Sequence, residues 1–410
     1  PMSWNAIGQT AWFNYTGPGR YTFSDETQDY FDWVNLGGGE ATTDANGQVI
    51  VSLPDTRAPS RRPMTISIEG QVWDESGQVI SGRASVLAHP ADVYVGLRTD
   101  RYFGREGQPL AIDLIAVTPD SQPIPGQKID VKVVEIRWER VPVEGQFGQY
   151  TWQRQEIEVE SGQVIAAADG TARYTFTPAG AGIYRVQALA RDNYERLNSA
   201  TLQLWVTGTT PVWWGRPSDT IDLIADKESY QPGDTAEILI PTPFTGTSYA
   251  LIAVERAGIQ AYEVVKIEGS TFVYTLPITE DHLPTIHVSV ALMKGTDAET
   301  PNPSYRTGSI ALSVEPVSRR LEVTITPSAT RAQPGETVTL DIKAVDARGE
   351  PVSAEVGVTV TDLAILSLMP PNSPSLEEQF YGSQGDYVYT EVALRALLDV
   401  LTDEMIEDQA

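Results

Sequence analysis

The chain has 410 residues, of which 29 are Lys or Arg and 55 are Asp or Glu, so its formal net charge is −26. A surface this acidic repels phosphate backbones and anionic lipid, which argues against nucleic-acid binding and membrane-surface binding. The sequence contains no cysteine, which excludes disulfides, thiolate metal sites, a Cys nucleophile and a Cys-derived thioester within these residues.

Short stretches of alternating polarity, rich in β-branched and aromatic residues and broken by turn residues, run through most of the chain. They predict an all-β fold of tandem antiparallel β-sandwiches, like fibronectin III or immunoglobulin domains, with a short C-terminal helix. In chain order, strands are predicted at 48–54, 129–138, 171–178, 236–240, 287–293 and 321–327. Residues 139–162 are expected to form an inserted hairpin, and the Pro- and Ser-rich segment 369–387 to be irregular. Helical spacing is found near the C-terminus, at Leu394, Leu397, Leu398, Leu401 and Met405.

A repeated turn sequence indicates the number of domains. The chain reads GREGQPLAIDL at 104–114, YQPGDTAEILI at 230–240 and AQPGETVTLDI at 332–342. The central residues of these turns are Gly107, Pro232, Gly233, Pro334 and Gly335. Pro fixes φ and Gly permits positive φ, so we expect structural turns at the start of each domain. A phosphate-binding loop is the rejected alternative, because no Lys-Ser/Thr and no helix follow.

The spacing of the repeats gives the predicted domain boundaries. The interval from Gly107 to Pro123 equals that from Gly335 to Pro351, and counting back from Gly47 places Pro1 at the position of Pro123. The chain is therefore expected to begin inside a domain and to be a fragment, which agrees with the lack of a signal-peptide pattern at its N-terminus. The expected domains are 1–90, truncated at its N-terminus, 91–208, containing the hairpin, 217–316 and 319–410.

These repeats resemble the macroglobulin-like domains of the bacterial α2-macroglobulin family. The domain-opening motif "DKxxYxPGD" of that family is matched by Asp226, Lys227, Ser229, Tyr230, Pro232 and Gly233. Further similarity lies in LIAVERAGI (251–259), PITEDHLPTIHVSVALMKG (277–295), YTFTPAGAGIYRVQALARD (174–192) and FYGSQG (380–385). Two departures are that Thr361-Asp362-Leu363 replaces Val-Asp-Glu and that the reactive Cys-x-Glu-Gln thioester motif is absent.

The resemblance implies a non-enzymatic scaffold of a broad-spectrum protease inhibitor, which traps proteases after they cut its bait region. The acidic segment 371–410 would then approach the bait. The partners implied are target proteases, acting through the full-length protein, and the expected state is a monomer in the periplasm, cell envelope or extracellular space. No cofactor, metal, catalytic residue or membrane insertion is expected. The alternatives are a cell-surface adhesin or carbohydrate-binding β-sandwich array, and an accessory part of a secreted hydrolase.

Several residues could suggest a site but have simpler structural explanations. Trp213 and Trp214 could stack on sugars, but adjacent Trp residues in a Pro-flanked linker are expected to wedge between domains. Asp44-Ala45-Asn46-Gly47 resembles the start of a calcium loop without its terminal Glu, so an Asx-type turn is expected. The three histidines, which follow no metal or triad spacing, are expected to be structural: His89, His282 and His287.

Overall fold

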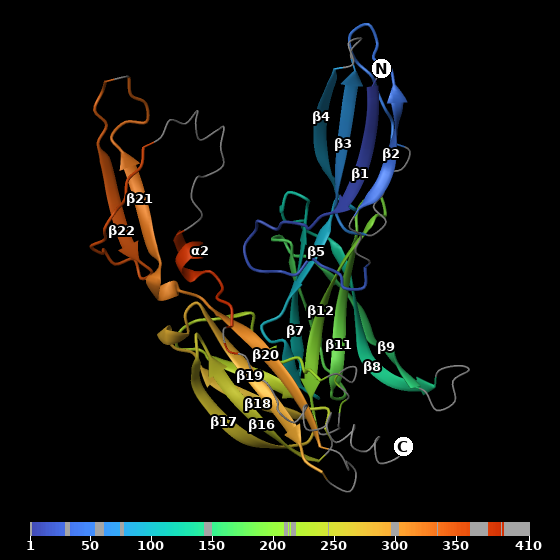
Figure 1. Cartoon of the computed structure of the whole chain (residues 1–410), viewed down its shortest axis with the longest axis vertical. Helices are drawn as coiled ribbons and strands as arrows, with labels where there is room; N and C mark the ends of the chain where they lie inside the picture. The colour runs from blue at the N-terminus through green and yellow to red at the C-terminus, as the bar shows by residue number, and fades with distance from the viewer. Residues whose placement is uncertain are drawn as a thin grey trace, which may run out of the picture. The chain divides into compact units, whose positions relative to one another are not determined.

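The protein is described by a computed structural model, which contains two compact units, Pro1–Arg216 and Pro217–Ala410 (Figure 1). The described residues are 2–28, 33–53, 61–73, 78–142, 150–208, 212, 214, 219–244, 246–296, 303–333, 335–360, 376–386 and 388. Almost all regular structure among them is β-strand, in mainly antiparallel sheets, as the alternation predicts. The predicted four-domain division itself stays a prediction.

The first unit begins with a single four-stranded sheet of order β2-β1-β3-β4. Its strands are β1 (Met2–Thr10), β2 (Val34–Ala41), β3 (Met64–Trp73) and β4 (Val79–Ala88). The prediction of a strand after Gly47 is wrong, because residues 48–53 form no β-ladder. Their side chains do alternate, with Leu53 packed against the core of the sheet and Ile50 exposed, so the pattern reports one-sided packing without strand pairing.

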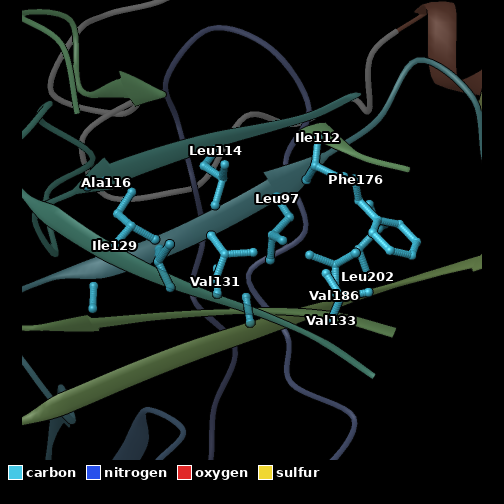
Figure 2. Packing of buried hydrophobic residues seen from close by; sticks show 14 of the residues in the cluster. Leu97, Ile112, Leu114, Ala116, Ile129, Val131, Val133, Phe176, Val186 and Leu202 are labelled. Atoms are coloured by element: carbon cyan, nitrogen blue, oxygen red, sulfur yellow. The ribbon is translucent and has the colours of Figure 1, made fainter. Parts of the chain in front are cut away.

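Eight strands of the first unit form a two-layer sandwich, here called the β5–β12 sandwich. They are β5 (Tyr94–Arg98), β6 (Phe103–Arg105), β7 (Leu110–Val117), β8 (Lys128–Pro142), β9 (Tyr150–Ile165), β10 (Thr171–Phe176), β11 (Gly182–Arg191) and β12 (Leu197–Thr207). A three-stranded sheet, β10-β7-β5, faces a five-stranded sheet, β6-β12-β11-β8-β9. Side chains from both sheets meet in the core, among them Leu97, Ile112, Val131 and Val186 (Figure 2). Of the residues predicted as a hairpin at 139–162, the described ones belong to the long β8–β9 pair, which runs out to the partners Pro142 and Tyr150.

The second unit contains the β13–β20 sandwich, which repeats this arrangement strand for strand. Its strands are β13 (Ile224–Ala225), β14 (Ser229–Tyr230), β15 (Thr235–Pro241), β16 (Thr247–Glu255), β17 (Ile259–Glu268), β18 (Thr271–Pro277), β19 (Thr285–Lys294) and β20 (Ser304–Val314). The sheet orders are β13-β15-β18 and β14-β20-β19-β16-β17. In both sandwiches the second strand pairs in parallel with the last, β6 with β12 and β14 with β20. The repeated turn sequence therefore reflects a repeated architecture.

The same pattern begins a third time in the antiparallel pair of β21 (Leu321–Pro327) and β22 (Leu340–Asp346). An isolated bridge joins Val345 to Pro351, as another joins Val117 to Pro123, which explains the equal spacing of these prolines from their glycines. A short helix, α2 (Leu376–Tyr381), lies where an irregular segment is expected, so that expectation is wrong there. Its sequence LEEQFY begins with good helix formers, which outweigh the flanking Pro and Ser. The helix predicted around 394–405 lies outside the described residues.

Residues 11–28 leave the first sheet and pack on the β5–β12 sandwich. Phe13 stacks on the ring of Tyr94 with centroids 3.8 Å apart. The backbones of Thr22 and Leu97 exchange two hydrogen bonds of 2.8 and 2.9 Å. The buried Asp25 carboxylate accepts a 2.5 Å hydrogen bond from the Ser199 hydroxyl on β12. The segment thereby covers part of the outer surface of the sandwich and ties it to the first sheet.

Candidate functional site

The glycines of the repeated turns are required by their backbone angles. The φ angle is +73° at Gly107, +101° at Gly233 and +90° at Gly335, a region that favours glycine. A Cβ built on any of the three would meet nothing within 4 Å, so crowding is not the reason. Pro334 lies outside the described residues, whereas Pro232 lies directly before Gly233 in its turn.

The acidic residue that follows each Pro-Gly pair closes its own turn. The Asp234 carboxylate accepts a 3.1 Å hydrogen bond from the Gln231 N–H, and the Asp234 N–H donates to the Gln231 carbonyl at 2.9 Å. The equivalent bonds join Glu336 and Gln333, at 2.8 and 3.0 Å. These acids are therefore engaged by the backbone of the turn. That the turns bind no ligand stays a prediction.

The turns are also tied to the ends of other strands in the same sandwich. The Gly107 N–H donates to the Pro178 carbonyl at 2.8 Å, just after β10. The Gly233 N–H donates to the Ile278 carbonyl at 2.9 Å, just after β18. The two glycines thus occupy equivalent places in the two sandwiches.

Two residues of the domain-opening motif, Asp226 and Tyr230, take part in a buried hydrogen-bond group. The Tyr230 hydroxyl donates to the Asp226 carboxylate at 2.7 Å, and the Glu237 N–H donates to the same oxygen at 2.8 Å. Burial, together with the neighbouring Asp226, raises the pKa of Tyr230, so the phenol stays a donor. Ser328 takes the equivalent position before Gly335, and its hydroxyl accepts the Thr339 N–H at 2.9 Å. The family-like motif thus joins the first strand of the sandwich to the strand beside it.

The three histidines occupy separate structural environments. His89 Nδ1 lies 2.8 Å from the Tyr94 hydroxyl. The buried His282 accepts the Thr279 N–H at Nδ1, and burial lowers its pKa, which favours the neutral ring that can accept. His287 Nε2 lies 3.0 Å from the carbonyl oxygen of Gln384. Within the described ranges, no group of three or more His, Asp or Glu side chains could hold a metal ion.

The Asx-type turn is confirmed: the Asp44 carboxylate accepts the N–H groups of Asn46 and Gln48 at 2.9 and 2.8 Å. Trp213 lies outside the described residues. Trp214 is described and is half-buried. The wedge between domains stays a prediction.

Two of the hollows among the described residues have the size of ligand sites. One, of about 550 Å³, lies in the β5–β12 sandwich and is lined by Glu135, Arg137, Trp138 and Tyr184 among others. Its Arg137 and Glu135 side chains are already paired, with Nε and Oε1 2.7 Å apart. The other, of about 640 Å³, lies between α2 and the β21–β22 pair and has a mainly aliphatic floor. Among the residues that the structure describes, neither lining contains a Ser, a His or a Lys.

One polar cluster, around Glu255, is not predicted from the sequence. Glu255 at the end of β16 is only 1% exposed, and its Oε1 accepts a 2.6 Å hydrogen bond from the Ser289 hydroxyl. Residues from the end of the described chain lie against it: Gln384 donates its N–H to the Thr285 hydroxyl at 3.3 Å, and the Asp386 carboxyl lies within hydrogen-bonding reach of Glu255. Burial, with the nearby Asp386, raises the pKa of Glu255. The sequence signal was a Glu on the alternating strand LIAVE, which alone predicts no contact with a residue so distant in the chain.

Comparison with known families finds two matching domain descriptions. Residues 97–204 match "Bacterial macroglobulin domain 6" and residues 221–368 match "Alpha-2-macroglobulin bait region domain". These ranges contain most of the β5–β12 sandwich, and the β13–β20 sandwich with the β21–β22 pair. The bait-region match ends before the acidic segment 371–410.

Individual relatives are distant in sequence, but the similarity extends over most of this chain. An "Alpha-2-macroglobulin homolog" of Nostoc sp. is 24% identical over 329 residues, covering 78% of this chain and 17% of its own length. The "Alpha-2-macroglobulin" of Escherichia coli is 24% identical over 373 residues, covering 84% of this chain and 22% of its own length. The chain therefore spans about a fifth of the length of these relatives. The solved native conformation of the E. coli protein covers 93% of this chain and 25% of its own, with 19% identity and a TM-score of 0.37. In the described residues, no helix is sufficiently long and apolar for a bilayer crossing.

Proposed function

Because the chain belongs to the bacterial alpha-2-macroglobulin family, we propose that it is scaffold within a protease inhibitor that traps proteases after they cut its bait. In this proposal the chain performs no catalysis. Its sandwiches form a stiff frame, and residues 371–410 lead from that frame to the segment that proteases cut.

The observation that carries the proposal is the coincidence of matched regions and repeated architecture. The two matched ranges, 97–204 and 221–368, each contain the core strands of a sandwich, and the two sandwiches have the same strand order. A frame that transmits a shape change needs packed, bistable joints rather than a titratable site. A segment that is to be cut must be extended and accessible, because proteases act on loops with few core contacts.

The wider properties of the inhibitor follow as further parts of the proposal. The chain spans about a fifth of its relatives' length, so the trap requires sequence that this chain does not contain. Its partners would be target proteases, which the whole protein would meet as a monomer in the periplasm, the cell envelope or outside the cell. Any thioester would be supplied from elsewhere, because this chain has no cysteine.

Limited digestion of the full-length protein by several proteases of different specificity tests the proposal. The expected result is one preferred cleavage region beyond residue 370, shared by all the proteases and followed by compaction measured by small-angle X-ray scattering. Scattered cuts between the sandwiches, without compaction, would refute it. That second outcome, combined with retention on a glycan array, would favour the carbohydrate-binding alternative.

A further inference from the structure

Glu255 is buried although it lies on the outer face of its sheet. Along β16 the residues Ala250, Ile252 and Val254 point into the sandwich core and are at most 3% exposed. Because side chains alternate along a strand, Glu255 must point to the opposite face. It pairs across the sheet with His287 of β19, on that same face. What removes Glu255 from solvent is therefore something that lies over this face.

The covering segment is 383–386, which follows α2. Two hydrogen bonds attach it to β19: the Gln384 N–H donates to the Thr285 hydroxyl at 3.3 Å, and His287 Nε2 contacts the Gln384 carbonyl oxygen at 3.0 Å. A ring N–H at Nε2 is the donor that a carbonyl requires. The segment is thus held through its backbone, and Asp386 is brought to Glu255.

The contact between Glu255 and Asp386 requires a proton. Oε1 of Glu255 accepts from Ser289, whereas Oε2 is buried and has no hydrogen-bond donor among the described residues. A carboxylate oxygen without a donor is costly to bury, and a second carboxylate beside it adds repulsion. If Glu255 is protonated, it donates a hydrogen bond to Asp386, and both penalties are removed.

We propose that a protonated Glu255 donates a hydrogen bond to Asp386 and so forms a latch, which holds residues 383–386 on the β13–β20 sandwich and opens as pH rises. The latch goes beyond the proposed function and does not depend on it. If the proposed function is also correct, the latch anchors the chain immediately before the acidic segment that leads to the bait.

The direction of the pH effect follows from the groups that face Glu255. Desolvation is the main cause that raises the pKa of its carboxyl, and Asp386 raises it further, while His287 on β19 acts in the opposite direction. On β17 the residue paired with Glu255 is the uncharged Ile259, and the neighbouring Arg256 side chain donates to the Asp281 carbonyl. The docked state consequently binds more protons than the undocked state. Docking is strongest below the ordinary Glu pKa of about 4.3 and is lost as pH rises through the raised value.

Hydrogen exchange of the 410-residue chain at pH 5 and pH 8, corrected for intrinsic exchange, measures the latch directly. Protection of peptides covering 382–388 is expected to fall severalfold between pH 5 and pH 8. In Glu255→Gln the neutral amide can donate to Asp386 at every pH, so protection should persist at pH 8. Asp386→Asn tests the same pair from the exposed partner and should also remain protected at pH 8.

Glu268→Gln is the matched control, because Glu268 is an exposed carboxylate on the neighbouring β17 and pairs with Lys266. It should keep the pH dependence of the unaltered chain. Equal protection at pH 5 and pH 8 in the unaltered chain would overturn the proposal. An unchanged pH dependence in both Glu255→Gln and Asp386→Asn would also overturn it, since the contact between these two carboxyl groups would then not be responsible. No protease is involved, so failure of the latch is distinguishable from failure of the proposed function.

Discussion

Removal of the Asp226 carboxylate is expected to destabilise the β13–β20 sandwich without changing the first unit. The side chain is 5% exposed and accepts hydrogen bonds from the Tyr230 hydroxyl and the Glu237 N–H, at 2.7 and 2.8 Å. Hydrogen bonds to a charged group contribute about 1.5–3 kcal/mol each, and loss of the acceptor leaves buried donors without it. Asp226→Ala should therefore lower the free energy of unfolding of this sandwich by about 3–5 kcal/mol.

The tryptophan distribution makes this loss measurable in the intact chain. All 9 Trp residues precede residue 217, so Trp fluorescence reports only the unit Pro1–Arg216. Urea unfolding followed by far-UV circular dichroism reports both units. Asp226→Ala should shift part of the dichroism transition to lower urea and leave the fluorescence transition unchanged.

The exposed counterpart Ser328 supplies a matched control, because its hydroxyl accepts one backbone N–H at the equivalent position. Ser328→Ala should cost only about 0.5–1.5 kcal/mol, the net value of one neutral hydrogen bond. If Asp226→Ala costs no more than Ser328→Ala, the buried group does not stabilise the sandwich and the reasoning is refuted.

Three further changes probe other parts of the chain. Gly233→Ala should cost about 1–2 kcal/mol because φ is +101° there, whereas Gly295→Ala, which needs no positive φ, should be nearly neutral in the same dichroism assay. Burial raises the pKa of Asp25, but hydrogen bonds, led by the one from Ser199, lower it overall. The stabilisation that Asp25 gives to the packed segment 11–28 is therefore fully present above about pH 4 and is lost as pH falls through the lowered pKa. Hydrogen exchange of residues 22–28 should show this loss in acid, and Asp25→Asn should remove the pH dependence; persistence in the variant would contradict it. Leu114→Ala in the core should cost about 2–5 kcal/mol and shift the fluorescence transition, and a shift in dichroism alone would contradict the assignment.

Alternation and turn chemistry predicted the strands because both are local properties. The segment 129–138 lies within β8 and 321–327 is β21, and each pairs with a neighbouring strand along its whole length. The same local signal failed at 48–53, where Leu53 packs on a core but no neighbouring backbone completes a ladder. Side-chain pattern reports burial, and pairing depends on a partner that the pattern does not contain.

The polar cluster around Glu255 could not be predicted for a related reason. Glu255 and Asp386 come from distant parts of the chain, and neither has a distinctive neighbourhood in the sequence. The packing of Phe13 on Tyr94 was missed in the same way, because it joins residues on opposite sides of a predicted boundary at residue 90. Turn residues such as Gly233 were predicted correctly as positions of positive φ, because that requirement is set by the turn alone.

The parallel pairing of β6 with β12, and of β14 with β20, has a consequence for synthesis on the ribosome. In each sandwich an early strand has its place at the sheet edge beside the last strand to emerge. Neither sandwich can therefore complete its larger sheet until its final strand, ending at Thr207 or Val314, has left the exit tunnel. Domains generally fold as units from the N-terminus during translation. We expect the two sandwiches to close in two separate steps, each set by the emergence of one strand.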